Sequence, residues 1–218
     1  MRTNAIAVLL VDDHPMVLTG IRRMLEAVDD VQVVGEATSA SEAMHELAVR
    51  HIDVALIDIS LPDENGLDLI RRFKQAAPHV AVLVLSGYGE DMYAMRALRA
   101  GADGYLTKGA ALNELVAAVR KIDNGGKHFS AFLNDLLIRH VQQGEVEEHC
   151  RLSSREFDIM MRLVGGASNN SIAAALHRSP KTISTHRSRL FEKLNIRSIA
   201  ELARYAIEQG LIGPTITK

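Results

Sequence analysis

The sequence predicts two domains: an α/β domain built on a doubly wound, five-stranded parallel sheet, and a smaller all-α domain after it. Three observations lead to this prediction. Short aliphatic runs alternate five times with segments of helical spacing over residues 1–124, strand signals stop at Leu152, and the sign of the charge changes near the same point. The 218 residues suffice for a hydrophobic core in each domain.

The five predicted strands are short and almost wholly apolar. They are Ile6–Val11, Val31–Glu36, Asp53–Ile57, Val80–Leu85 and Gly104–Leu106. Apolar runs of this length are typical of strands covered by helices on both faces, as in a parallel sheet. Ligands of such sheets bind at the carboxyl ends of the strands, so the predicted site lies at that edge.

Segments with helical spacing separate the strands. They are Val17–Ala27, Ala40–Arg50, Leu67–Ala76, Asp91–Ala100 and Leu112–Ile122, and in the first of them the apolar residues share one face. Gly125 and Gly126 end this half, so we expect one domain over residues 1–124 and a polar linker over residues 125–151.

From residue 152 to residue 218 the pattern is helical only. The predicted helices are Ser154–Val164, Asn170–Leu176, Pro180–Leu194 and Ile199–Glu208. Ser153 is an expected N-cap, with Glu156 three residues later completing a capping box. Pro180 suits the first turn of the third helix, because proline is well tolerated there.

Composition narrows the class of protein. Apolar residues make up 47% and charged residues 24%, as in ordinary soluble globular domains. No apolar run approaches the ~20 residues that span a bilayer, and the N-terminal apolar stretch is too short for a signal peptide. The single cysteine, Cys150, cannot form an internal disulfide, so we expect a cytoplasmic protein with Cys150 as a free thiol.

The net charge of −2 conceals an asymmetry between the two halves. From residue 151 onward there are 11 Lys and Arg against 5 Asp and Glu, which gives +6. The first 150 residues then hold 14 against 22, which gives −8. We expect the first half to bind cations or cationic partners and the second to bind a polyanion.

Five polar side chains follow strand ends in the first half: Asp12, Asp13, Asp58, Ser86 and Lys108. Because parallel strands end at one edge of the sheet, these side chains should surround a single crevice. Three carboxylates so close together repel one another and call for a counter-ion, and Mg²⁺ prefers oxygen ligands of this kind. The alternative is that the acids cap the helices that follow them.

The motifs VDDHP, DISLPDENGLDLI, LSG and GYLTK resemble the receiver domain of two-component response regulators, a flavodoxin-like fold, over residues 5–124. The resemblance implies that Asp58 accepts a phosphoryl group from a sensor histidine kinase. It also implies a magnesium site formed by Asp13, Asp58 and the backbone carbonyl of Ser60, with Asp12 acting through water.

By the same resemblance, Lys108 pairs with the phosphoryl oxygens, Ser86 moves to hydrogen-bond them and Tyr105 swings inward behind Ser86. The family often has proline after the lysine, with a cis peptide bond, whereas this chain has Gly109. A non-proline cis bond costs ~3–4 kcal/mol, so the sequence leaves the geometry of this loop open.

In the basic half, the third predicted helix turns Ile183, Leu190 and Leu194 inward and small polar and basic side chains outward. Such a helix suits the major groove of DNA, and the alternative is a merely solvated basic face. The motifs LSSRE, SNNSIA, SPKTISTHRSRL and KL resemble the LuxR-type helix-turn-helix over residues 152–210. The two resemblances together indicate a NarL/FixJ-type response regulator.

The second resemblance implies that seven residues contact DNA: Lys181, Thr182, Ser184, Thr185, Arg187, Ser188 and Arg189. Arg187 and Arg189 are expected on the phosphate backbone, and Arg187 stands close to the buried face. Asn170 and Ser171 replace residues that are often charged in the family. The last helix, Ile199–Glu208, is expected to dimerise the domain on a two-fold DNA site.

The leading hypothesis is therefore a transcription regulator that binds DNA when phosphorylated, and not a turnover enzyme. An aspartyl-phosphate phosphatase is disfavoured, because such enzymes have a second Asp two residues after the nucleophile, where this chain has Ser60 after Asp58 and His14 after Asp12. A receiver that acts only through protein contacts, or is never phosphorylated, stays open. The nine histidines show no metal-ligand spacing, and His14 is interpreted as a helix-start residue.

Overall fold

The computed structural model describes residues 5–87, 90–130, 148–176, 178–209 and 211–212. The chain divides into two compact units, residues 1–137 and 138–218. Most of the predicted linker lies outside the described residues, as does the side chain of Cys150. Each unit is therefore described by itself.

Unit 1 is the predicted doubly wound α/β domain. Strands and helices alternate in the order β1 (Ile6–Val11), α1 (Pro15–Leu25), β2 (Val31–Ala37), α2 (Ala40–Val49), β3 (Val54–Asp58), α3 (Gly66–Ala76), β4 (Ala81–Ser86), α4 (Glu90–Ala100), β5 (Gly104–Thr107) and α5 (Leu112–Asp123). All neighbouring strands are parallel, in the sheet order β2-β1-β3-β4-β5. The order reverses direction at β1, and the crevice of such a sheet forms at this point.

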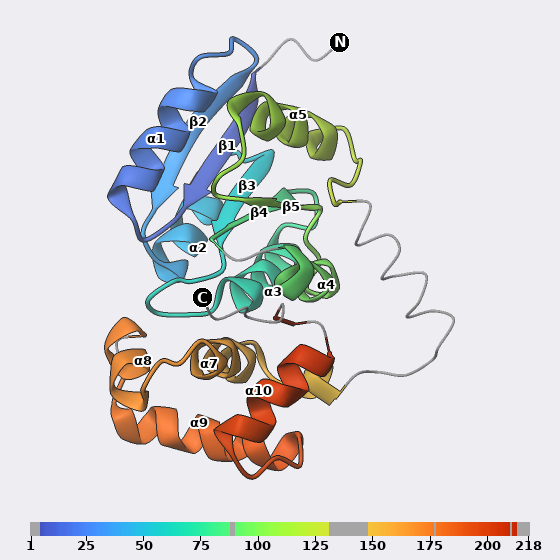
Figure 1. Cartoon of the computed structure of the whole chain (residues 1–218). Helices are drawn as coiled ribbons and strands as arrows, with labels where there is room; N and C mark the ends of the chain where they lie inside the picture. Colours follow the sequence, from blue (N-terminus) through green and yellow to red (C-terminus); the bar gives the residue numbers. More distant parts are fainter. Residues whose placement is uncertain (1–4, 88–89, 131–147, 177, 210, 213–218) are drawn as a thin grey trace. The chain divides into compact units, whose positions relative to one another are not determined.

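Helices cover both faces of this sheet, with α1 and α5 on one side and α2, α3 and α4 on the other (Figure 1). Strands β1, β3 and β4 are buried on both faces, which explains why they are apolar almost throughout, whereas the edge strand β2 exposes Gln32 and Glu36. One face of the core joins alternate strand residues such as Val8, Leu56 and Leu83 to the apolar stripes of α1 and α5.

The described part of unit 2 contains a short 3₁₀ turn, η1 (Glu148–Arg151), followed by α7 (Ser154–Val164), α8 (Asn169–Ala175), α9 (Pro180–Lys193) and α10 (Ile199–Glu208). A serine side chain caps the N-terminus of each of these four helices: Ser153, Ser168, Ser179 and Ser198. The predicted capping box of Ser153 and Glu156 is present, and Pro180 occupies the first turn of α9. Asn195 ends α9 with a φ of 51°, a conformation that asparagine tolerates better than most residues.

The observed ends of several elements differ from the predicted ones by one or two residues. Helix α1 begins at Pro15 rather than Val17, and β3 runs to Asp58 rather than Ile57. The ends are defined by backbone hydrogen bonds, which the side-chain pattern does not report, so differences of this size occur in both directions.

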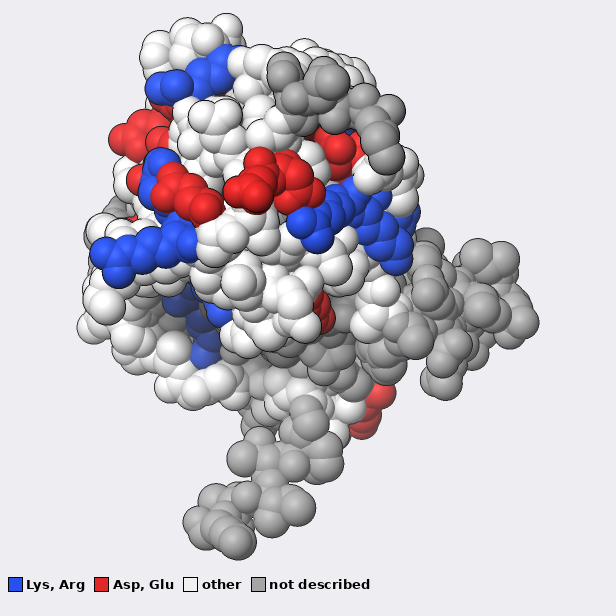
Figure 2. All heavy atoms as spheres, turned by 90° about the horizontal axis from the view of Figure 1, so that it is seen from above, with Lys and Arg blue, Asp and Glu red and all other residues white. Residues whose placement is uncertain are grey.

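Charged side chains of both signs lie in small neighbouring groups on the face seen in Figure 2. Ion pairs across unit 1 follow the same pattern, for example Arg120 Nη2 to Asp30 Oδ1 at 2.7 Å and Arg22 Nη1 to Glu26 Oε1 at 3.1 Å. Exposed pairs of this kind contribute little stability, so the fold depends on its apolar core.

Candidate functional site

The carboxylates predicted at the strand ends do come together. Val11 pairs with Ile57 between parallel strands β1 and β3, so Asp12 and Asp58 follow at the same edge of the sheet. Both are almost fully buried, at 3% exposure each. Asp12, Asp13, His14 and Asp58 each offer one ligand atom, and these four atoms lie within 4.8 Å of one another.

Lys108 extends into this cluster from the end of β5. Its backbone N–H donates to the carbonyl of Ser86 at 2.8 Å, which holds the chain beside β4. Its Nζ lies 2.6 Å from Asp12 Oδ2 and 3.0 Å from Asp58 Oδ2. Lys108 thus joins the ends of three strands through one ammonium group.

The pKa shifts of Asp58 and Lys108 follow from their burial and from the charges beside them. Burial raises the pKa of Asp58, and the neighbouring charge of Asp12 raises it further, against the lowering effect of Lys108. Burial alone would lower the pKa of Lys108, but its contacts with Asp12 and Asp58 raise it overall. Lys108 therefore stays charged, while the buried Asp58 carboxylate is short of compensating charge.

His14 belongs to the cluster, which the sequence did not lead us to expect. Its backbone N–H donates to Asp12 Oδ1 at 2.9 Å, and its Nδ1 lies 3.0 Å from the same oxygen and 2.7 Å from Asp13 Oδ1. His14 is the N-cap residue of α1, as interpreted from the sequence, but its side chain makes no cap bond. The sequence signal for this contact is the position of His14 directly after Asp13.

The loop after Asp58 is folded tightly over the strand end. The Gly66 N–H donates to the Ile59 carbonyl at 2.8 Å, and Ser60 forms an isolated antiparallel bridge with Asn65. A Cβ on Gly66 would lie 2.1 Å from the backbone oxygen of Asp58. This close approach admits only glycine, and it fixes the backbone that carries Asp58 and Ser60.

Ser86 is completely buried at the end of β4, and Tyr105 in β5 is 2% exposed. The tyrosine ring therefore already lies inside the domain in this structure. The peptide bonds of the described residues, including the one between Lys108 and Gly109, are all trans.

The charges and donor atoms suit a divalent cation. Three carboxylates and one ammonium leave a formal charge of −2 at the cluster, counting His14 as neutral. The available carboxylate oxygens are hard donors that Mg²⁺ accepts, together with waters. Asp12, Asp13, Asp58 and the carbonyl of Ser60 are the groups that would hold it.

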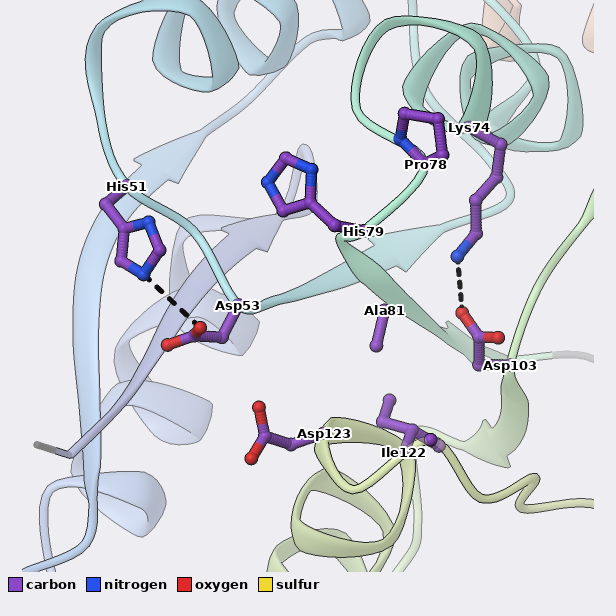
Figure 3. Close-up of a pocket in the computed structure, with 10 residues that line it drawn as sticks. His51, Asp53, Lys74, Pro78, His79, Ala81, Asp103, Ile122 and Asp123 are labelled. Carbon is purple, nitrogen blue, oxygen red and sulfur yellow. Dashed lines mark hydrogen bonds and ion pairs between the residues drawn. The ribbon is translucent and has the colours of Figure 1, made fainter. Parts of the chain in front are cut away.

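A second hollow, of about 320 Å³, lies at the opposite, amino-terminal edge of the sheet (Figure 3). Charged side chains line it, but they engage one another: Lys74 Nζ lies 2.6 Å from Asp103 Oδ2, and His51 Nε2 lies 3.3 Å from Asp53 Oδ1. Asp12 and Asp58 lie at the other, carboxyl-terminal ends of the strands. It takes no part in the site described above.

Helix α9 of unit 2 presents the predicted polar face. Lys181, Ser184, Thr185, Ser188 and Arg189 are exposed, whereas Ile183 and Leu190 are fully buried. The hydroxyls of Thr185 and Ser188 donate to carbonyls one turn earlier, at 3.1 Å each. Their oxygens still face outward, so the helix offers short polar groups between two cations.

Other predicted DNA contacts on α9 are also engaged within the domain. Thr182 serves the α9 cap, with its hydroxyl 2.9 Å from Ser179 Oγ. The guanidinium of Arg187 lies over the Phe191 ring, 5.7 Å from its centroid. Asn169 Nδ2 donates to Ser184 Oγ at 3.3 Å, a link between α8 and α9 that sequence reasoning missed.

Comparison with known proteins agrees with the family resemblance of both halves of the chain. Residues 8–120 match the response regulator receiver domain, and residues 151–206 match the luxR family of bacterial regulatory proteins. Response regulator UvrY of Escherichia coli is 36% identical over 208 residues, which cover 94% of this chain and 95% of UvrY. Response regulator GacA of Pseudomonas protegens is 38% identical over 212 residues, covering 97% and 100%.

Among solved structures, RcsB of Salmonella enterica serovar Typhimurium, bound to a promoter in the presence of the phosphomimetic BeF₃⁻, superimposes with a TM-score of 0.62. It is 28% identical, and the match covers 93% of this chain and 98% of RcsB. The chain belongs to the NarL/FixJ-type response regulators of two-component systems. It is a transcription regulator with a receiver domain and a LuxR-type DNA-binding domain, and its partners are a sensor histidine kinase and DNA. No helix among the described residues is long and apolar enough to cross a membrane.

Proposed function

We propose that Asp58 is the phosphoacceptor of this regulator and that its phosphorylation increases binding of unit 2 to DNA. The observation that supports it most is the contact of Lys108 with both Asp12 and Asp58 at the sheet edge where the strand order reverses. One Asp58 oxygen would attack the phosphorus of a phosphohistidine, and the imidazole would leave with the electrons of the P–N bond. This transfer requires positioning and charge neutralisation more than covalent help.

Each neighbour has a proposed role. Lys108 would exchange its contact with the Asp58 carboxylate for the incoming phosphoryl oxygens. Bound at Asp12, Asp13, Asp58 and the Ser60 carbonyl, Mg²⁺ would supply positive charge to the same oxygens. Ser86, buried beside them at the end of β4, would hydrogen-bond the phosphoryl group, and Tyr105 would occupy the inward position it has in this structure.

The DNA interface is proposed on α9, with Lys181, Ser184, Thr185 and Ser188 near base edges and Arg189 on phosphate. Thr182 and Arg187 would contribute from the edge of α9 that faces the DNA backbone.

We further propose domain boundaries of 1–124, 125–151 and 152–218. We also propose a cytoplasmic location, which follows from the DNA partner, and no turnover activity beyond the protein's own phosphorylation and dephosphorylation.

The intact mass of the protein after incubation with acetyl phosphate and Mg²⁺ tests the phosphoacceptor. We expect one phosphoryl adduct on the wild type and on Asp29→Asn, an exposed control carboxylate, and none on Asp58→Asn. An adduct that persists in Asp58→Asn would refute the assignment. The same samples, assayed by gel shift on a duplex enriched from a random pool, test the switch, which equal affinity with and without the adduct would exclude.

A further inference from the structure

His186 occupies an unusual position on α9. It lies on the flank of the helix, between the buried face of Ile183 and Leu190 and the exposed face that carries Arg189. The side chain is half-buried, and its Nδ1 has no hydrogen-bond partner within the described part of the chain. A buried nitrogen left without a partner costs free energy in either tautomer, so the position calls for an explanation.

Charged groups from three segments act electrostatically on this imidazole. Helix α7 contributes Arg155 and Glu156, the turn before α9 contributes Arg178, and α9 itself contributes Arg189. Glu156 is the one carboxylate among them, and it is already engaged. It accepts from Lys193 Nζ at 2.7 Å and from the Ser153 N–H at 2.8 Å.

These surroundings favour neutral His186 when no DNA is present. Burial lowers the pKa of His186 below 6.5, the charge of Glu156 opposes this, and the three arginines lower the pKa further. DNA phosphates beside Arg189 and the start of α9 would bring negative charge to this surface. That charge offsets the arginines and favours the imidazolium form.

We propose that His186 takes up a proton when α9 binds DNA, so that the affinity for DNA rises as the pH falls. The inference rests on the DNA interface proposed above for α9. It gives this chain a coupling between proton concentration and DNA binding that is separate from phosphorylation, because the groups involved all belong to unit 2.

The direction of this pH dependence follows from the thermodynamic linkage between proton binding and DNA binding. If the pKa of His186 is higher in the complex than in the free protein, the additional affinity is complete below the free pKa. It disappears as the pH rises through the pKa of the complex. Each unit of difference between the two pKa values corresponds to a tenfold change in affinity, so a rise of about half a unit to one unit gives roughly a three- to tenfold change.

The test uses the full chain and a duplex enriched from a random pool by binding to it, at constant salt. Calorimetric titrations in two buffers of different ionisation enthalpy count the protons taken up at pH 6.5, and equilibrium binding from pH 8 to pH 5.5 gives the affinity. We expect uptake and a three- to tenfold affinity rise in the wild type and in His79→Gln, an exposed histidine of unit 1. In His186→Gln both the proton uptake and the rise in affinity should fall to the remainder that other titratable groups contribute.

Unchanged proton uptake in His186→Gln would overturn the proposal. If that variant does not fold, the imidazole NMR titration of His186 in the wild type, free and DNA-bound, decides instead, and equal pKa values would overturn it. If the full chain enriches no duplex from the random pool at any pH, the interface on α9 fails and the proposal with it, so the two failures are distinguishable.

Discussion

Lys108 compensates two buried carboxylates at once, and its removal should show what that contact contributes. Lys108→Gln leaves Asp12 and Asp58 facing each other without a cation. Because the lysine is partly exposed, we expect a loss of about 2–3 kcal/mol in the free energy of unfolding, at the low end for a broken buried pair. Calorimetric unfolding measures it, with the exposed Lys121→Gln as a control.

Mg²⁺ sharpens this prediction. Without Lys108, the net charge of the cluster is more negative by one. Mg²⁺ should therefore raise the unfolding temperature of Lys108→Gln more than that of the wild type. An equal rise in both proteins would mean that the ion does not bind among Asp12, Asp13 and Asp58.

At the scale of single residues, the sequence predicted the acids and the lysine of this cluster, but not His14 and not the individual contacts. Asp12, Asp58 and Lys108 could be placed because each follows a strand, and parallel strands end at one edge. The contact of His14 with two carboxylates could not, since it depends on side-chain rotamers. The inward position of Tyr105 was expected from the family resemblance alone, as a movement behind Ser86. Periodicity carries no information about rotamers.

At the scale of elements, the start of α3 depends on the absence of a side chain at Gly66. Gly66→Ala would place a Cβ 2.1 Å from the Asp58 carbonyl oxygen and 2.8 Å from Ile59 Cα, so the loop must move. We expect a loss of about 2–3 kcal/mol in the free energy of unfolding, together with a loss of phosphoryl adduct.

Gly20 provides the matched control for this substitution. It lies inside α1, and a Cβ there would meet nothing within 4 Å. Gly20→Ala should therefore stabilise the protein by about 0.5–1 kcal/mol, because alanine is the better helix former. Equal effects of the two substitutions in thermal unfolding would contradict the role given to Gly66.

The capping box of α7 makes a pH-dependent contribution to the stability of unit 2. Burial would raise the pKa of Glu156, but hydrogen bonds from Lys193 and Ser153 lower it overall below 4.5. Such a group stabilises the fold above its unfolded pKa, and this stability is lost as the pH falls through the lowered folded value. Glu156→Gln should cost about 1–2 kcal/mol at pH 7 and progressively less below pH ~4.5.

Calorimetric unfolding of unit 2 between pH 7 and pH 4 checks this difference. Glu192→Gln, an exposed substitution on α9, should leave the transition unchanged across the same range. A penalty for Glu156→Gln that is independent of pH would show that the cap acts through shape rather than charge.

The elements themselves were largely predictable, and the reason differs between the two units. In unit 1, strands buried on both faces appear as unbroken apolar runs, so β1 and β3 were easily found. In unit 2, the capping box of Ser153 and Glu156 indicates the start of α7, and Pro180 indicates the start of α9. The predicted helix begins at Asn170, one residue after the observed start of α8 at Asn169, and Asn169 also contacts Ser184 of another helix. Local sequence cannot reveal such a contact.

At the scale of the whole molecule, an acidic receiver and a basic DNA-binding unit share one chain, with −8 and +6 formal charges across residues 1–150 and 151–218. This asymmetry disfavours association of the receiver with DNA and leaves contact with phosphate to unit 2. We expect the joining of two copies of unit 2 to contribute to the affinity for a paired site, and the exposed isoleucines of α10 offer a surface for it.

Ile199 and Ile207 of α10 are 44% and 46% exposed, and eight residues of helix place them on the same face. We expect a second copy to cover this stripe when two copies occupy paired half-sites. Ile207→Asp should then lower the affinity for a two-half-site duplex roughly ten- to a hundredfold, since burial of one isoleucine contributes about 1.5–3 kcal/mol. Affinity for a single half-site should be unchanged, and Glu208→Gln, on the neighbouring face, should alter neither. Equal weakening on both duplexes would mean that Ile207 supports the fold of unit 2 rather than the pairing of two copies.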